Sequence, residues 1–147
     1  MKAKIHAIST SEKKGMQKEN VPFAILQEEF GIVGDAHAAK WHRQVSLLAL
    51  ESIKKMKDLG LDVDSGDFAE NITTVGINLV SIPVGTKLRI GNDVIIRITQ
   101  IGKECHNKCA IYYQAGDCVM PKEGVFAEVL KGGKIKPEDE IEVIEND

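Results

Sequence analysis

The chain has 147 residues, of which 43% are hydrophobic and 5% aromatic, and its 19 basic and 22 acidic residues give a formal charge of −3. This length indicates one domain, residues 1–147, that can bury an ordinary core without disulfides or metal ions. The nearly even charge balance provides no general attraction to polyanions, so we expect no nucleic-acid partner and no membrane partner.

The apolar segments are too short to span a bilayer. The longest uncharged stretch, residues 71–86, is interrupted by Gly76, Pro83 and Gly85 and is shorter than the roughly 18 apolar residues that a spanning helix needs. The N-terminal sequence MKAKIHAIST lacks the apolar region of a secretory signal. We therefore expect a cytoplasmic protein whose three cysteines are thiols, thiolates or metal ligands.

The N-terminal half predicts two strands, a loop and a helix, in that order. Residues 2–9 and 21–26 have the apolar content of short strands. Residues 31–44, GIVGDAHAAKWHRQ, follow neither strand nor helix periodicity and predict a long functional loop. Residues 49–59 predict a helix, because Leu50, Ile53 and Met56 recur at helical spacing and Gly60 follows.

The C-terminal half predicts mostly strands. Residues 86–90 and 94–98 alternate apolar and polar side chains and predict a hairpin around Gly91-Asn92. Residues 125–130 and 140–145 predict two further strands. Short strands with glycine-rich turns and no regular βαβ alternation favour a mainly β (α+β) fold, a curved antiparallel sheet that closes into a β-barrel with a few peripheral helices.

A cluster of cysteines, GKECHNKCAIYYQAGDC, follows the predicted hairpin. A helix over about residues 106–114 would place Cys105 at its N-terminus, where backbone N–H groups and nearby cations favour the thiolate. Such a thiolate can attack sulfur, carry a persulfide or bind a soft metal. Two alternatives stay open: Cys109 and Cys118 as buried structural residues, and a zinc site formed by the three cysteines with His106.

Two glycine–aspartate motifs carry further polar residues. In the loop, Gly34-Asp35-x-His37 precedes Arg43-Gln44, and a planar guanidinium is suited to a phosphate or to the edge of a fused ring. Downstream, GDFAEN places Asp67 and Glu70 next to Asn71. These groups can bind a ligand or perform acid–base chemistry, or they can hold turns through hydrogen bonds.

Together these segments resemble a stand-alone MOSC domain, similar to the C-terminal domain of molybdenum cofactor sulfurase, over about residues 2–144. The resemblance rests on GIVGDAH, WHRQVSLLALESI, GDFAENITTVGINL, PVGTKLRIG, VIIRITQIGKEC and GVFAEVLKGGKIKPEDEI in this order. It implies a β-barrel that binds the molybdenum cofactor (molybdopterin) and handles sulfur. Cys105 matches the family's reactive cysteine, as sulfur carrier or molybdenum ligand, and the implied cofactor-binding residues are Gly34, Asp35, His37, Arg43, Gln44, Asp67 and Asn71.

The resemblance leaves the reaction open. The chain itself is expected to hold no PLP, so a PLP-dependent cysteine desulfurase or a molybdenum cofactor biosynthesis protein is an expected partner and a molybdoenzyme a possible acceptor. Alternatives are a cofactor-dependent reductase of N-hydroxylated small molecules, a non-catalytic cofactor carrier or sensor, and a zinc or structural-thiol domain. Ala69, where the family often has glycine, and the additional Cys109 and Cys118 depart from the usual pattern.

Overall fold

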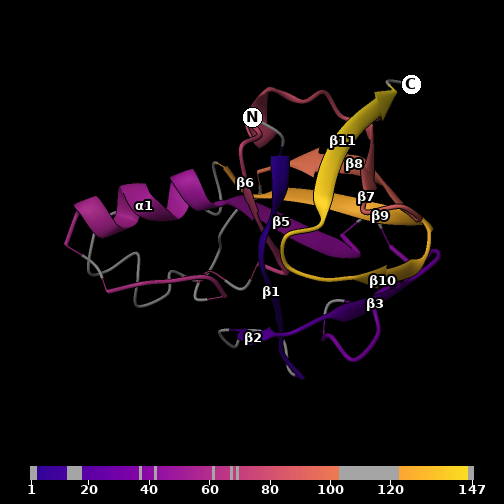
Figure 1. The fold of residues 1–147 in the computed structure, drawn as a ribbon, viewed down its shortest axis with the longest axis horizontal. Coiled ribbons are helices and arrows are strands. Elements are labelled where there is room, and N and C mark those ends of the chain that lie inside the picture. The colour runs from indigo at the N-terminus through magenta and orange to yellow at the C-terminus, as the bar shows by residue number, and fades with distance from the viewer. Residues whose placement is uncertain are drawn as a thin grey trace.

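The computed structural model describes residues 3–12, 18–36, 38–41, 43–60, 62–66, 68, 70–102 and 123–145. Eleven strands, one α-helix and one 3-10 helix lie within these residues (Figure 1). In chain order they are β1 (Ala3–Thr10), β2 (Glu19–Val21), β3 (Ala24–Gln27), β4 (Gly31–Ile32), β5 (Val45–Ala49), α1 (Leu50–Asp58), β6 (Ile72–Val75), η1 (Leu79–Ser81), β7 (Lys87–Ile90), β8 (Val94–Ile101), β9 (Val125–Lys131), β10 (Gly133–Ile135) and β11 (Glu140–Glu145).

Seven strands close into a barrel. Their order is β11-β7-β8-β9-β5-β6-β1, and β1 pairs with β11 to complete the ring, with Ala3 opposite Ile141. β2 adds to β1 as an eighth strand of the same sheet. The predicted β-barrel with peripheral helical structure is therefore confirmed.

One pair of neighbouring strands in the barrel is parallel. β5 and β6 run in the same direction, with Leu47 opposite Ile72, whereas every other strand pairing in the described part of the chain is antiparallel. A parallel pair needs a crossover connection, and α1 lies in that connection. In Figure 1, α1 extends sideways from the end of β5, away from β3 and β10.

The barrel interior is aliphatic. Alternate residues of each strand point inward, as in β8, where Val94, Ile96 and Ile98 are buried and their neighbours are partly exposed. β5 is buried at all five positions because it has apolar neighbours on both faces. Leu47 belongs to the barrel core, whereas Leu48 belongs to a second cluster outside the wall.

The second cluster attaches α1 to the outer face of the barrel. Ile53 and Met56 of α1 pack with Leu48, Val63, Phe68 and Phe126. The helix ends as predicted, with the Gly60 N–H donating to the Lys57 carbonyl at 2.9 Å. Phe68 of the GDFAEN motif and Phe126 of β9 thus share one apolar layer under the helix.

The structure refines the predicted strands in two places. The single strand expected over residues 21–26 is two strands, β2 and β3, which are separated by Pro22 and Phe23. Proline has no N–H to donate to a ladder, which explains the break. The predicted hairpin is formed by β7 and β8, but Ile90 pairs with Val94, so its turn contains three residues, 91–93.

A three-stranded sheet, β10-β3-β4, lies beside the barrel. Its inner residues Ala24, Leu26, Ile32 and Ile135 join the barrel core. No helix in the described residues is long and apolar enough to cross a membrane.

Candidate functional site

The described structure contains five of the eight predicted site residues, namely Gly34, Asp35, Arg43, Gln44 and Asn71. His37 and Asp67 lie outside the described residues. Cys105, Cys109 and Cys118 do as well, so the predicted helix over 106–114 and the zinc alternative also concern residues that the structure does not describe. Among the described residues, no group of three or more His, Cys, Asp or Glu side chains could hold a metal ion.

Arg43 is held on the outer face of the barrel wall. Its Cζ lies 5.4 Å from the centre of the Phe126 ring and 5.8 Å from that of Trp41, within cation–π range. Its Nε–H donates to Oε1 of Gln100 at 3.2 Å. Within the described part of the chain, no acceptor bonds to the terminal nitrogens of this guanidinium.

Phe126 connects Arg43 to the GDFAEN motif. The Phe126 side chain belongs to the hydrophobic cluster that contains Phe68. The Arg43 guanidinium lies over the Phe126 ring. Residues 43, 68 and 126 are far apart in sequence, and the barrel wall brings them together. The loop motif and the GDFAEN motif therefore meet at Phe126, as a shared site requires.

Gly102 and Gly124, which flank the cysteine-bearing residues 103–122 in the sequence, lie side by side at one point of this wall. The Gly102 N–H donates to the Gly124 carbonyl at 2.6 Å, so the chain leaves β8 and returns to β9 at the same place. The Gly102 carbonyl accepts a 2.7 Å hydrogen bond from Nε2 of Gln100, the residue that also holds Arg43. Arg43 is thus two hydrogen bonds away from the start of the segment that carries Cys105.

Asp35 forms a buried ion pair. Its Oδ1 lies 2.7 Å from Nζ of Lys18, and both side chains are fully buried. The same oxygen accepts from the Ser11 N–H at 3.1 Å, while Lys18 Nζ also donates to Ser11 Oγ at 3.1 Å. The Lys18 N–H donates to the Gly66 carbonyl at 2.8 Å. The pair therefore holds the Gly34-Asp35 turn against the GDFAEN loop.

Asn71 is fully buried just before β6, and its side chain bonds to β5 and β1. Its Oδ1 accepts from the Ser46 N–H at 3.0 Å and from Ser46 Oγ at 3.1 Å, and its Nδ2 donates to the Ser9 carbonyl at 3.2 Å. Gln44 is also buried, and its Oε1 accepts from the Val129 N–H at 2.9 Å. Both amides thus satisfy backbone groups of the barrel, which otherwise would be buried without partners.

Glu70 is a buried acid that the sequence singled out only as part of a carboxylate pair. Its Oε2 accepts from the Gly66 N–H and from Thr73 Oγ1, both at 2.9 Å. Its Oε1 is buried and has no hydrogen-bond partner among the described residues. Burial raises the pKa of Glu70 above its ordinary value, and the hydrogen bonds from Gly66 and Thr73 only partly offset this effect.

Sequence reasoning missed two residues of this region, Lys18 and Gln100. Lys18 follows a polar stretch in which every charged residue looks solvated, so no local signal marks it as buried. Gln100 stands at the end of an alternating strand. A polar residue shortly before the cysteine segment is the one signal that could have singled it out.

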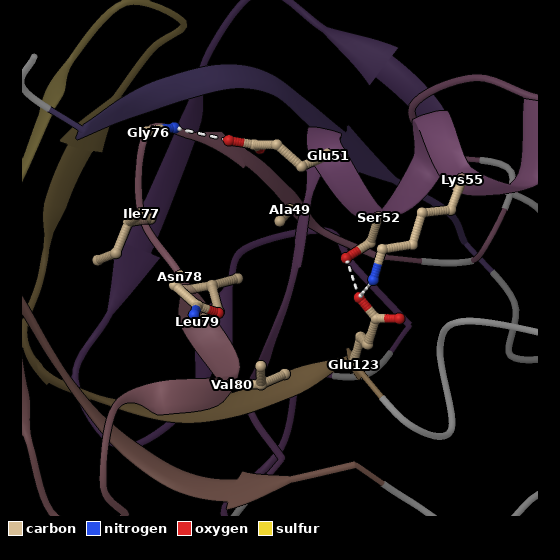
Figure 2. Close-up of a pocket in the computed structure, with 10 residues that line it drawn as sticks. All are labelled: Ala49, Glu51, Ser52, Lys55, Gly76, Ile77, Asn78, Leu79, Val80 and Glu123. Atoms are coloured by element: carbon tan, nitrogen blue, oxygen red, sulfur yellow. Dashed lines mark hydrogen bonds and ion pairs between the residues drawn. The ribbon is translucent and has the colours of Figure 1, made fainter.

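A cleft of about 290 Å³ lies at the start of α1, next to the loop that follows β6. Figure 2 shows Ser52 and Lys55 of α1 pointing toward Glu123, the residue that precedes Gly124. Ser52 Oγ donates to Oε1 of Glu123 at 2.7 Å, and Lys55 Nζ donates to the same oxygen at 2.9 Å. Across the cleft, Glu51 accepts from the Gly76 N–H at 3.2 Å. Glu123, which lies just before β9, is therefore attached to α1.

Comparison with known families identifies the fold. Residues 34–142 match the MOSC domain family. The chain belongs to this family. MOSC domains are associated with binding of the molybdenum cofactor, and the matched range includes both glycine–aspartate motifs and the cysteine segment. No curated protein matches the sequence.

Three solved structures share the MOSC fold of this chain. YuaD from Bacillus subtilis aligns with a TM-score of 0.79 at 16% identity, covering 96% of this chain and 94% of its own. YiiM from Geobacillus stearothermophilus aligns with a TM-score of 0.71 at 16% identity, covering 97% of this chain and 75% of its own. YiiM from Escherichia coli aligns with a TM-score of 0.71 at 18% identity, covering 100% of this chain and 71% of its own.

The Arg43 region fits one part of the molybdenum cofactor. The cofactor carries a phosphate and a fused-ring pterin, and the free end of a guanidinium is a bidentate donor for a phosphate. Among the described residues, no acceptor bonds to the terminal nitrogens of Arg43. The rings of Trp41 and Phe126 contact the guanidinium and restrict its orientation. The side-chain oxygens of three other predicted site residues instead accept hydrogen bonds from protein groups, namely Asp35 Oδ1, Gln44 Oε1 and Asn71 Oδ1.

Proposed function

We propose that this MOSC protein binds the molybdenum cofactor beside Arg43 and handles sulfur at Cys105, which acts as sulfur carrier or as thiolate ligand of molybdenum. The observation that carries this proposal is the chain of hydrogen bonds from Arg43 through Gln100 to Gly102, where the cysteine segment begins. It links the one described guanidinium that suits the cofactor's phosphate to the base of the segment with the reactive thiol. When bound, the cofactor supplies a redox-active metal centre.

The other predicted site residues divide between contact and support. We assign Arg43 to the phosphate, and we keep Gly34, His37 and Asp67 as proposed cofactor-binding residues. Asp35, Gln44 and Asn71 are proposed to position the loops of the two glycine–aspartate motifs, because each bonds to protein groups in the buried wall. Supporting residues of this kind orient the groups that contact a ligand.

The source of sulfur is proposed to be a separate PLP-dependent cysteine desulfurase. The Cys105 thiolate would take the terminal sulfur of the donor's persulfide and release the donor's own cysteine as a thiolate. A molybdenum cofactor biosynthesis protein or a molybdoenzyme would then accept that sulfur or the loaded cofactor.

The proposal is tested by the molybdenum and pterin content of protein purified without oxygen from a host that makes the cofactor. We expect both at close to one per chain in the wild type and a loss of at least about tenfold in Arg43→Gln, the effect of a lost charged hydrogen bond. Arg89→Gln is the matched control, because Arg89 is an exposed guanidinium on β7 that pairs with Glu142.

Cys105→Ser separates the two roles of the thiol, with Cys109→Ser as control. Loss of molybdenum with retention of pterin identifies a metal ligand. Retention of both, with loss of persulfide after incubation with a desulfurase and cysteine, identifies a sulfur carrier. Absence of molybdenum and pterin from the wild type, or equal content in Arg43→Gln and wild type, would contradict the proposed cofactor site.

A further inference from the structure

Trp41 is the single tryptophan of the chain, and its ring lies beside the guanidinium to which we assign the cofactor's phosphate. Arg43 Cζ lies 5.8 Å from the centre of the Trp41 ring and 5.4 Å from that of Phe126. Both distances are within cation–π range. The guanidinium therefore lies over two aromatic rings at once.

The two rings differ in their access to solvent. Phe126 is buried, with 6% of its surface exposed, and it belongs to the apolar cluster that attaches α1 to the barrel. Trp41 and Arg43 are only partly buried. A molecule that reaches Arg43 from solvent can therefore contact the indole, whereas protein covers the Phe126 ring.

The backbone that carries Trp41 is held on both sides. The Trp41 N–H donates to the Ala39 carbonyl at 2.9 Å, and the Ala39 N–H donates to the Phe30 carbonyl at 2.8 Å. After Arg43, the buried Gln44 side chain bonds to β9. The fold thus sets the place of Trp41 before a ligand binds, which lowers the entropic cost of a contact with its ring.

The distance between the guanidinium and the indole suits a ligand that carries both an anion and a flat ring. A phosphate bound by the terminal nitrogens of Arg43 would have its oxygens about 2.7–2.9 Å from these atoms. Because Arg43 Cζ is 5.8 Å from the centre of the indole, a ring joined to that phosphate by a short linker lies within reach of Trp41. A fused heterocycle has a π face that stacks on an aromatic side chain, and an inorganic oxyanion has none.

We propose that Trp41 makes this site select a phosphate ester with a planar fused ring over a free oxyanion such as phosphate or molybdate. Arg43 binds the phosphate, and Trp41 stacks on the ring. This inference rests on the proposed function, which supplies a pterin as the ring. It goes further, because Trp41 is not among the predicted site residues.

The test compares three ligands on the full chain, prepared in a host that does not make the cofactor. They are a phosphate ester of an oxidised pterin, guanosine monophosphate and inorganic phosphate, and calorimetry gives each dissociation constant. Stacking on an aromatic side chain tightens binding by about 5- to 150-fold. We therefore expect the pterin ester to bind the wild type at least about fivefold more tightly than inorganic phosphate, and more tightly than guanosine monophosphate.

Trp41→Leu removes the ring and keeps an apolar side chain. It should weaken binding of the pterin ester at least about fivefold and leave the affinity for inorganic phosphate within about twofold of the wild type. Trp41→Phe keeps a ring and should recover most of the affinity for the ester. Phe23→Leu is the matched control, because Phe23 is an exposed ring in a separate cation–π pair, with Lys134 Nζ 4.6 Å from its centre. This control should bind all three ligands as the wild type does.

The fluorescence of Trp41 provides a second readout on the unaltered chain. Because Trp41 is the only tryptophan, its emission reports on this one ring. Titration with the pterin ester should quench this emission with the dissociation constant that calorimetry gives, after correction for absorption by the pterin. Saturating inorganic phosphate should leave most of the emission, since it places no ring on the indole.

Each of three results would overturn the inference. Equal losses of affinity for the ester and for inorganic phosphate in Trp41→Leu would make the indole a support for Arg43. An unchanged affinity of Trp41→Leu for the ester would remove Trp41 from the site, and tighter binding of guanosine monophosphate than of the ester would exclude a pterin as the ring. Failure of the proposed function has a different signature, because Arg43→Gln would then bind the ester and inorganic phosphate as tightly as the wild type.

Discussion

Lys18 Nζ and Asp35 Oδ1 lie 2.7 Å apart with both side chains fully buried. The two residues belong to different loops, and Ser11 bonds to both of them. Removal of one charge leaves the other buried without its counter-ion, which is more costly than the pair itself is favourable.

Asp35→Asn should therefore lower the free energy of unfolding by about 3–5 kcal/mol, as found for buried pairs that lose one partner. Urea unfolding at constant pH measures this change. The double variant Lys18→Met/Asp35→Leu should recover a large part of the loss, because it removes both charges. Glu142→Gln, which breaks the exposed pair with Arg89, should cost at most about 1 kcal/mol and serves as the control. Equal losses in Asp35→Asn and Glu142→Gln would contradict the burial argument.

Glu70 should make the stability of the protein depend on pH. Its pKa is raised by burial, so the folded chain holds the proton more tightly than the unfolded chain. Protonated Glu70 therefore contributes to the stability of the folded state. This contribution is complete below the ordinary pKa of 4.5 and is lost as the pH rises through the raised pKa of the folded state.

Glu70→Gln should abolish this pH dependence. The glutamine keeps an acceptor for the Gly66 N–H and Thr73 hydroxyl and stays neutral. Unfolding free energies measured between about pH 4 and 8 should fall with a slope of up to about 1.4 kcal/mol per pH unit more in the wild type than in the variant. Glu142→Gln, on an exposed side chain, is the control. If the unfolding free energies of the wild type and of Glu70→Gln changed with pH in parallel, Glu70 would not be the source of the pH dependence.

Gly66 should tolerate no side chain. A Cβ at this position would lie 2.2 Å from the Lys18 carbonyl oxygen, and its φ of +92° is strained for other residues. Gly66→Ala should lower the unfolding free energy by more than about 3 kcal/mol, since it combines left-handed strain with a steric clash. Gly60 is the matched control, because its φ is +94° and a Cβ there meets nothing within 4 Å. Gly60→Ala should cost only about 1–2 kcal/mol. Thermal unfolding of the two variants and the wild type measures both changes.

A substitution of Asn71 can distinguish a residue that supports the barrel from one that contacts the cofactor. Asn71→Ala leaves the Ser46 N–H and the Ser9 carbonyl without their buried partner and should cost about 2–5 kcal/mol. Asn78→Ala, on an exposed side chain without a capping hydrogen bond, should stay within about 0.5 kcal/mol. A stably folded Asn71→Ala that has lost only the cofactor would instead make Asn71 a direct contact.

The elements that the sequence predicted correctly are those set by local periodicity. Alternation of Val94, Ile96 and Ile98 produces β8, and the helical spacing of Ile53 and Met56 produces α1. Local turn chemistry also set the break at Pro22, although the apolar run around it suggested one continuous strand. Enough short strands of this kind imply a barrel, because an unclosed sheet would leave its edges unpaired.

The sequence by itself determined that this chain forms a β-barrel of the MOSC family and which motifs carry its polar residues. The tertiary structure alone decided their partners: Lys18 for Asp35, Ser46 for Asn71, and Gln100 for Arg43. These partners stand 17, 25 and 57 positions apart. Periodicity reports which face a residue occupies, but contacts across such separations depend on strand register and on the path of the loops, which no local pattern contains.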